Sequence, residues 1–287
     1  MKNVLIVGKT SYIGCAFQRW MADKASDWNI EAVSSRDGAW KNVDYGKYDC
    51  ILHLAGIAHV NAKNDMEQEY YKVNRDLAVD SCKKAKEDGC KQFVFMSSII
   101  VYGESTSLKP FMIDKNTKPC PNGFYGNSKL QAEEEIKKMS DADFSVAIVR
   151  PPMVYGKNSK GNYRKLAKMA GTFPVFPNMK NQRSMIHIDN LCEFLRLLIE
   201  NEDKGIFCPQ NKQYVNTTDL VCEIANVKGK RILTTKIFNP ILYCMSKKVK
   251  LINKVFGSLC YETSMSDYYD WKYCVCDFKE SVERTER

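Results

Sequence analysis

The sequence predicts an α/β fold, a doubly wound parallel sheet followed by a smaller C-terminal domain. In the first half of the chain, short apolar runs alternate with helical stretches. The apolar runs are nearly continuous, which is typical of parallel strands buried on both faces. After Arg150, proline and glycine break this pattern into loops and short elements. We therefore expect a first domain over residues 1–155, to which 184–201 return, and a second domain over 156–287.

Each element follows from its local pattern. The expected strands are the apolar runs NVLIVG (3–8), NIEAVSS (29–35), CILHLAG (50–56), QFVFMSS (92–98) and FSVAIVR (144–150). The expected helices lie between them and beyond, at about 12–24, 65–88, 124–139, 189–201 and 217–227. Within 65–88, Val73, Leu77, Ala78 and Cys82 recur at helical spacing on one face. In such a sheet, ligands bind at the carboxyl ends of the strands, near the point where the strand order reverses.

Composition narrows the class of protein. The chain has 287 residues, 44% hydrophobic and 27% charged, which is typical of a globular protein. Its net charge of +9 is spread along the sequence, which favours a surface that attracts phosphorylated small molecules over a nucleic-acid-binding protein. The twelve cysteines have no CxxC spacing and the three histidines form no metal-ligand pattern. We expect reduced thiols, no metal and a cytoplasmic location.

One segment invites a different reading. Residues 237–257, IFNPILYCMSKKVKLINKVFG, are amphipathic and basic. We expect a helix packed on its own domain; contact with a membrane surface or a partner is the alternative. No apolar run approaches the ~20 residues that a transmembrane helix needs.

A glycine-containing turn joins the first strand to the first helix. Between two such elements, glycines let backbone N–H groups and the positive helix end approach a pyrophosphate. A purely structural turn is the alternative. The residues that we expect to contact a dinucleotide here are Gly8, Thr10, Ser11, Tyr12, Ile13 and Gly14.

The end of the second strand indicates which dinucleotide fits. Ser35 and Arg36 stand there and suit a ribose 2′-phosphate, so we expect NADP. The neighbouring Asp37 leaves NAD possible.

A serine, a tyrosine and a lysine carry side chains that can serve redox chemistry on an alcohol or a ketone. Tyr125 and Lys129 are four residues apart, on one face of the expected helix. A tyrosine has a pKa of ~10, and we expect the nearby ammonium to lower the pKa of this phenol toward neutrality. Ser98 lies at the carboxyl end of a strand, on the ligand side of the sheet. The alternatives to a catalytic role are a surface pair for Tyr125 and Lys129 and a structural strand-end residue for Ser98.

Together these motifs resemble a known family. The runs GKTSYIG, LHLAG (52–56), FVFMSSIIVYG (93–103), YGNSK (125–129) and RPPMVYG (150–156) resemble extended short-chain dehydrogenases, and more narrowly the nucleotide-sugar epimerase/dehydratase family. QRSMIHIDNL (182–191) is similar to the family's return to the sheet. Ser11 departs from the pattern, since the family has glycine there. The resemblance implies a Rossmann-type fold with a C-terminal substrate-binding domain, and a homodimer formed through helices 65–88 and 124–139.

The resemblance also implies roles for single residues. Ser98, Tyr125 and Lys129 match the catalytic set, and Lys129 also matches the lysine on the nicotinamide ribose. Asn162 and Arg183 fall where relatives contact the nucleotide diphosphate of the substrate. The remaining cofactor positions match His53, Leu54, Ala55 and Gly56 at the third strand, the supporting Asn74, and Pro151 and Met153 near the nicotinamide.

Two isoleucines after Ser98 restrict the set of reactions that we expect. Dehydratases of this family carry an acid pair after the catalytic hydroxyl, where this chain has Ile99 and Ile100. We therefore expect reduction of a UDP-4-keto-6-deoxy-hexosamine in polysaccharide synthesis, with Tyr125 as proton donor. The short 36–49 connection and the NADP signal favour it. A UDP-sugar 4-epimerase with bound NAD is the alternative, and a non-catalytic dinucleotide-binding regulator is a further one.

Overall fold

A computed structural model of the chain describes residues 1–24, 27–58, 66–105 and 107–287. The chain divides into two compact units. The first unit comprises Met1–Gly103, Pro119–Pro151 and Leu191–Cys208, and the second comprises Glu104–Lys118, Pro152–Asn190 and Pro209–Arg287. Each unit has a hydrophobic core of its own.

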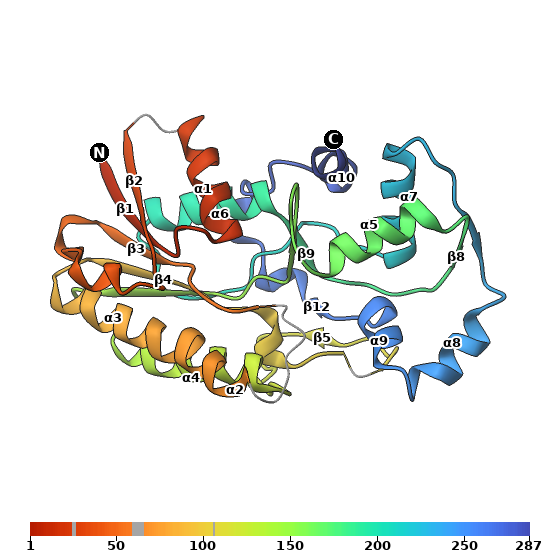
Figure 1. Cartoon of the computed structure of the whole chain (residues 1–287), viewed down its shortest axis with the longest axis horizontal. Coiled ribbons are helices and arrows are strands. Elements are labelled where there is room, and N and C mark those ends of the chain that lie inside the picture. The colour runs from red at the N-terminus through yellow and green to blue at the C-terminus, as the bar shows by residue number, and fades with distance from the viewer. Residues whose placement is uncertain (25–26, 59–65, 106) are drawn as a thin grey trace. The chain divides into compact units, whose positions relative to one another are not determined.

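The first unit is built on a parallel sheet (Figure 1). Within the described residues it has six strands in the order β10-β6-β4-β3-β1-β2, all paired in parallel. After β1 the chain adds β2 on one side and β3 on the other, so the strand order reverses at β1. The strands are β1 (Lys2–Val7), β2 (Trp28–Val33), β3 (Cys50–His53), β4 (Gln92–Met96), β6 (Ser145–Val149) and β10 (Gly205–Phe207).

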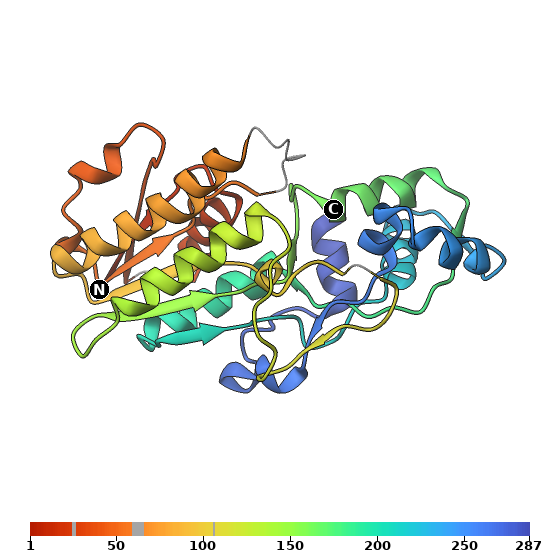
Figure 2. The same cartoon turned by 90° about the horizontal axis from the view of Figure 1, so that it is seen from below.

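Helices cover both faces of this sheet, which confirms the predicted doubly wound α/β fold. α3 (Leu77–Glu87) and α4 (Phe124–Lys138) lie side by side on one face (Figure 2). α1 (Tyr12–Ala22) and α6 (Ile188–Glu200) lie on the other, joined by a hydrogen bond of 2.9 Å from Trp20 Nε1 to Glu193.

The helix predicted over 65–88 is not uniform. Residue 65 lies outside the described residues, and the described part begins with a single α-turn, α2 (Glu67–Tyr70). A π-helical segment, η4 (Tyr71–Asp76), follows before α3. π-turns are rare and occur often at functional sites. Here the π segment contains Asn74, one of the predicted site residues.

The connection from β2 to β3 is short, as predicted. Residues 34–49, all of them described, contain two 3₁₀ turns, η1 (Ala39–Asn42) and η2 (Tyr45–Lys47), and no additional helix–strand pair. Trp40 and Tyr45 are buried from this connection into the core of the first unit.

The second unit packs helices around an aromatic and aliphatic core. α5 (Asn162–Thr172), α7 (Thr217–Val227) and α10 (Phe278–Glu286) contribute Tyr163, Ile224 and Val282 to it. Short parallel pairs complete the unit: β7 (Met153–Tyr155) with β9 (Met185–His187), β8 (Val175–Pro177) with β11 (Leu233–Thr235), and β5 (Met112–Ile113) with β12 (Cys260–Tyr261). The 3₁₀ turns η6 (Thr263–Met265) and η7 (Tyr268–Trp271) lie near the C-terminus.

The basic segment 237–257 forms two helices rather than one. α8 (Asn239–Ser246) and α9 (Lys250–Phe256) are separated by Val249, whose backbone is extended. α9 buries Ile252 and Phe256 in the core, but none of the eight residues of α8, all of them described, is buried. The expectation of a packed helix therefore holds for α9, whereas α8 reaches the core with half-buried side chains such as Leu242.

The thiols are unpaired, as predicted. All twelve cysteines are described, none forms a disulfide, and seven are buried. In the described part of the chain, no helix combines the length and the apolarity that crossing a bilayer requires.

Candidate active site

The loop after β1 meets the segment after β3. Gly8 has φ +119°, and a Cβ atom built on it would lie 2.9 Å from the backbone nitrogen of Ala55. Both the backbone angle and the space therefore require glycine. This contact lies where the strand order reverses, at the carboxyl ends of β1 and β3, and Leu54 and Ala55 are buried there.

Ser11 has a structural task that explains why it replaces glycine. Its Oγ accepts a hydrogen bond of 3.1 Å from the Gly14 amide and so caps the N-terminus of α1. The oxygen is therefore engaged by the N-terminus of α1. Thr10 is exposed and Ile13 half-buried on the same turn.

His53, at the end of β3, is fully buried between aromatic rings. Its ring centroid lies 5.8 Å from that of Phe93 and 6.1 Å from that of Phe95. Neither ring nitrogen has a hydrogen-bond partner among the described residues. Burial, followed by the positive charge of Lys129, lowers the pKa of His53 to about 3. The imidazole is therefore neutral at physiological pH.

Asn74 fixes the loop that follows His53. Its Oδ1 accepts from the Ile57 amide at 2.8 Å, and its Nδ2 donates to the Ile57 carbonyl at 3.1 Å. Nδ2 also donates to Ser128 on α4 at 3.3 Å. A Cβ on Gly56 would lie 3.0 Å from Asn74 Oδ1 and 3.2 Å from Lys129 Nζ. Residues 56, 74 and 129 thus converge at this edge of the sheet.

Ser98 and Tyr125 are joined by a hydrogen bond between their side chains. Ser98 follows β4 and caps the 3₁₀ turn η5 (Ile99–Tyr102) by accepting from the Ile100 amide at 3.3 Å. Tyr125 lies in the first turn of α4, and its ring contacts the buried Tyr70 edge-on at 6.1 Å between centroids. The structure therefore brings the predicted serine and tyrosine together.

Lys129 lies one turn further along α4 and is 5% exposed. Its Nζ donates to the Met96 carbonyl at 2.8 Å and lies 4.6 Å from the centroid of the Phe95 ring. Burial lowers the pKa of Lys129 to about 8, and the charge of Glu133 opposes this shift. The ammonium is thus held beneath the loop after β3.

One expectation about the tyrosine is wrong. The sequence predicts that the ammonium lowers the pKa of Tyr125, but burial raises it, and the hydrogen bond with Ser98 only partly offsets that rise. The reason is geometric, because Lys129 directs its Nζ to the Met96 carbonyl. Tyr125 is consequently a neutral phenol at physiological pH.

A buried charged network under this site was missed by sequence reasoning. Glu133, 3% exposed, accepts from Nε and Nη2 of Arg150, whose side chain is 6% exposed, at 2.5–3.1 Å. It also accepts from the Ser97 hydroxyl, and Arg150 Nη1 donates to Tyr102 at 2.7 Å. Burial opposes the charge on Arg150, but the bonds to Glu133 outweigh it and raise the pKa of the guanidinium. A signal existed, since Glu133 follows Lys129 at helical spacing.

The other predicted residues of the first unit lie nearby in the fold. Ser35 is half-buried, and Arg36 is exposed with its amide bonded to Ser34 Oγ at 3.3 Å. Asp37 accepts from the Ala39 amide at 3.1 Å. The carbonyl of Pro151 accepts from the Ile99 amide at 2.9 Å and so ties β6 to the loop that carries Ser98.

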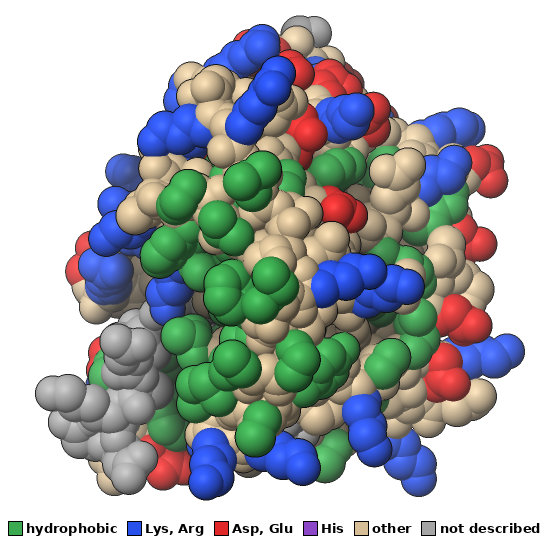
Figure 3. All heavy atoms as spheres, turned by 90° about the vertical axis from the view of Figure 1, so that its right-hand side faces the viewer, with side chains coloured by type: hydrophobic (Ala, Val, Ile, Leu, Met, Phe, Trp, Pro, Cys, Tyr) green, Lys and Arg blue, Asp and Glu red, His purple; other side chains and the backbone are tan. Residues whose placement is uncertain are grey.

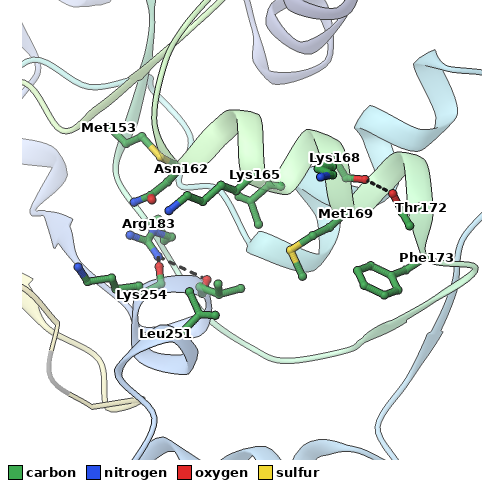
Figure 4. Close-up of a pocket in the computed structure, with 12 residues that line it drawn as sticks. Met153, Asn162, Lys165, Lys168, Met169, Thr172, Phe173, Arg183, Leu251 and Lys254 are labelled. Atoms are coloured by element: carbon green, nitrogen blue, oxygen red, sulfur yellow. Dashed lines mark hydrogen bonds between the residues drawn. The ribbon is translucent and has the colours of Figure 1, made fainter. Parts of the chain in front are cut away.

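The second unit contains a cavity of about 340 Å³ (Figure 4). It is lined by Met153, Asn162 and Arg183, which the sequence singled out, together with α5 and α9. Asn162 opens α5, and Arg183 Nη1 donates to the carbonyls of Lys254 at 2.5 Å and Val255 at 3.4 Å. Lys165, Lys168 and Lys254 also line it, and its described lining includes no acidic residue. The surface of the cavity itself is almost entirely apolar, although four of its lining residues carry positive charge.

Comparison with known proteins identifies the family. The model of the NAD dependent epimerase/dehydratase family matches residues 4–208. A UDP-glucose 4-epimerase from Vibrio cholerae is 30% identical, over 89% of this chain and 83% of that protein. An N-acetyl-α-D-glucosaminyl-diphospho-ditrans,octacis-undecaprenol 4-epimerase from Escherichia coli O157:H7 is 25% identical, over 89% and 82%.

Solved structures share the fold at lower identity. RMD from Pseudomonas aeruginosa, complexed with NADPH, has a TM-score of 0.76 at 16% identity and covers 99% of this chain, with 98% of that chain matched. UDP-glucuronic acid 4-epimerase from Bacillus cereus, in complex with NAD, has a TM-score of 0.75 at 16% identity, with coverages of 99% and 95%. The chain therefore belongs to the NAD dependent epimerase/dehydratase family, and it is an NAD(P)-dependent enzyme of the extended short-chain dehydrogenase type.

Proposed function

We propose that this enzyme reduces the 4-keto group of a UDP-linked 4-keto-6-deoxy-hexosamine, with NADPH as the hydride donor. The observation that carries the proposal is the neutral Tyr125 phenol, hydrogen-bonded to Ser98 at the carboxyl end of the sheet. A protonated phenol is ready to donate to the alkoxide that forms when hydride reaches a ketone. Ser98 holds that phenol in place and donates to the same oxygen.

The residues present fit a dinucleotide. Gly8 allows close approach of backbone at the strand-order reversal, and α1 directs its positive end toward the same loop. In this proposal the bound nicotinamide supplies the hydride, and Lys129 holds the nicotinamide ribose. Asn74 keeps the loop after β3 in the shape that receives it. His53 stays neutral beneath that loop and takes no part in proton transfer.

Lys129 acts toward the cofactor rather than toward the phenol in this proposal. Because the pKa of Lys129 is about 8, its ammonium is mostly charged at neutral pH. That ammonium is held by the Met96 carbonyl beneath the loop after β3, where it can donate to a ribose hydroxyl. Glu133 and Arg150 hold α4 and the end of β6 together beneath the lysine.

Elimination of water is disfavoured at this site. Ile99 and Ile100 follow Ser98, and Ile99 is 8% exposed within η5. Aliphatic side chains carry no proton to transfer, so the acid pair of a dehydratase has no counterpart here. This leaves direct reduction or epimerisation through a transient ketone.

For substrate binding, we propose that the cavity of the second unit holds the nucleotide diphosphate. Arg183 presents a guanidinium suited to phosphate oxygens, and Asn162 lies at the N-terminus of α5, where the helix dipole favours negative charge. Structures of MoeE5 with UDP-glucose and with UDP-glucuronic acid share this fold, with TM-scores of 0.70.

NADP is the cofactor that we propose. Ser35 and the exposed Arg36 follow β2 and suit a 2′-phosphate, whereas the carboxylate of Asp37 accepts a hydrogen bond from the Ala39 amide. We further propose a cytoplasmic homodimer that works in polysaccharide synthesis.

A 4-epimerase is the second candidate, and the relatives favour it. The Vibrio cholerae and Escherichia coli relatives are both named as 4-epimerases. In that reaction Tyr125 first accepts the proton of the sugar hydroxyl and later returns it. The raised pKa of Tyr125 bears on both reactions, because epimerisation ends with the same reduction step. We rank reduction first because of Ser35 and Arg36 after β2 and the short connection over residues 34–49.

A substrate test separates the two. The protein is incubated with a UDP-4-keto-6-deoxy-hexosamine and NADPH or NADH, and separately with UDP-glucose or UDP-GlcNAc without reductant. Loss of nicotinamide absorbance at 340 nm with the ketone, fastest with NADPH, is the expected result. Interconversion of the second pair of sugars with no consumption of reductant establishes the epimerase instead.

A further inference from the structure

Large hydrophobic side chains gather on one surface of the second unit. Of the twelve that are exposed among the described residues, nine lie in the part of the second unit between residues 173 and 251. Figure 3, which faces the α8 and β8 side of Figure 1, shows hydrophobic side chains grouped together with lysines and arginines along their borders. We call this surface the apolar patch: Phe173, Val175, Leu233, Ile237, Phe238, Ile241, Tyr243, Met245 and Leu251.

The helix α8 is the centre of the patch. Ile237 is 80% exposed and Ile241 60%, and of the described residues of α8 none is buried. Leu242 is its half-buried contact with the core. A helix of this length is not stable in water by itself, and a surface helix normally covers its apolar face. The patch therefore has the character of a surface that another phase or molecule covers.

The chain segment that contains α8 and α9 carries charges of one sign, and Lys228 and Lys254 pair with Glu286 and Glu104 of other segments. Residues 224–261, all described, contain eight lysines and arginines and no aspartate or glutamate. At the average of the whole chain, 38 residues would contain four or five acidic ones. All eight basic side chains are exposed: Lys228, Lys230, Arg231, Lys236, Lys247, Lys248, Lys250 and Lys254.

We propose that the apolar patch binds the surface of an anionic phospholipid bilayer. Leu233, Ile237 and Ile241 would enter the boundary between headgroups and acyl chains, while the surrounding lysines contact lipid phosphates. A helix with an aliphatic face and basic flanks, lying in the plane of the interface, is the usual form of such a contact. An anionic lipid surface attracts all of the basic residues around the patch at once, so the charge pattern favours a membrane over a protein partner.

The binding cavity opens on the same surface. Phe173 and Leu251 belong to the patch and also line the cavity, and Lys254 belongs to both the basic set and the lining. Membrane contact and ligand entry therefore share an edge of the second unit. The proposal itself does not depend on the enzyme's reaction, because it rests on exposure and charge.

Vesicle sedimentation tests the proposal. The full chain is mixed with vesicles of phosphatidylcholine alone, or of equal parts phosphatidylcholine and phosphatidylglycerol, and then spun. We expect binding to the mixed vesicles, a much weaker signal on phosphatidylcholine, and loss of binding at ~1 M salt, where screening is strong. Equal binding to both vesicles, or none to either, overturns the proposal.

Two pairs of variants locate the contact. Ile237→Ser with Ile241→Ser removes inserted side chains, and we expect at least about tenfold weaker partitioning. Lys247→Glu with Lys248→Glu should cost at least about thirtyfold, from about 1 kcal/mol per lysine. The matched controls are Ile206→Ser, another exposed isoleucine, and Lys41→Glu with Lys47→Glu, which are exposed in the connection from β2 to β3. Controls that lose binding as much as the patch variants refute the assignment.

A second copy of the chain is the competing occupant. All variants alter exposed side chains, so circular dichroism should report an unchanged fold. If analytical ultracentrifugation shows self-association that disappears in the Ile237→Ser, Ile241→Ser variant, and vesicle binding is absent, the patch is a subunit interface and the membrane proposal is wrong.

Discussion

Replacing Glu133 by glutamine removes the negative partner of Arg150 and keeps the shape of the side chain. In the folded protein, Glu133 accepts three close contacts from the guanidinium and one from the Ser97 hydroxyl, with both charged groups almost fully buried. The variant removes the carboxylate that neutralises the buried Arg150, while Tyr102 still accepts from its Nη1. Breaking a buried ion pair on one side costs about 3–5 kcal/mol, because an uncompensated charge stays in a medium of low polarity.

That loss of unfolding free energy can be measured by thermal unfolding. For a unit of this size, about 3–5 kcal/mol corresponds to a fall in the unfolding midpoint of roughly 10 °C. Differential scanning calorimetry of the two proteins gives the shift. The neighbouring Glu134→Gln makes the same chemical change on the exposed face of α4 and should stay within about 0.5 kcal/mol of the parent.

A second variant separates the charge from the packing. Glu133→Leu with Arg150→Met replaces the pair by apolar side chains, and such replacements are often neutral or stabilising. We expect the double variant to recover much of the lost stability. A loss below 1 kcal/mol for Glu133→Gln, or no difference between it and Glu134→Gln, would show that the network is not a stabilising ion pair and refute the reasoning.

Four further predictions concern the site itself. Tyr125→Phe should lower kcat about 10²–10⁴-fold while NADPH binding, followed by fluorescence titration, is kept; full turnover contradicts the mechanism. Gly8→Ala should weaken NADPH binding more than Gly38→Ala, because both positions have positive φ but at Gly38 no atom lies within 4 Å of an added Cβ; equal effects would mean that the clash is unimportant. With a pKa of about 8 for Lys129, kcat/KM should fall as pH rises through 8, and Lys129→Met should abolish this limb of the profile; a limb that persists belongs to another group. The pKa of about 3 for His53 lies below its unfolded value, so its contribution to stability is complete above pH 6.5 and declines as pH falls. Between pH 7 and 5 the free energy of unfolding should fall by about 2 kcal/mol on this account. Urea unfolding at the two pH values measures the loss, which should be absent in His53→Leu.

The sheet could be predicted because each of its strands is recognisable from its own stretch of sequence. Buried parallel strands appear as continuous apolar runs, and the expected strands at 3–8, 29–35 and 92–98 correspond to β1, β2 and β4. The helix predicted at 217–227 has those bounds in the structure. Asn216 explains its start, since the side chain caps the amides of Thr218 and Asp219.

The features that could not be predicted depend on contacts distant in sequence. Tyr125 and Lys129 are neighbours on α4, but the direction of the lysine is set by the Met96 carbonyl, 33 residues upstream. The partner of Glu133 is 17 residues away and on another element. Spacing places such side chains on one face of a helix and carries no information about what lies opposite. The exposure of α8 was missed for the same reason, because an amphipathic pattern does not say what covers the apolar face.

The π-helical segment η4 changes which side of the helix faces the core between α2 and α3. A π-turn holds one more residue than an α-turn, and one residue corresponds to a rotation of about 100° around the axis. Tyr70, before that turn, packs on Phe124, while Ala78 and Cys82, after it, face the core of the sheet. Asn74 lies where this change occurs. Deleting a single residue there would convert the π-turn into a regular α-turn and rotate the side-chain amide of Asn74 away from Ile57. The hydrogen bonds between Asn74 and Ile57 therefore depend on the extra residue of the π-turn as well as on the asparagine.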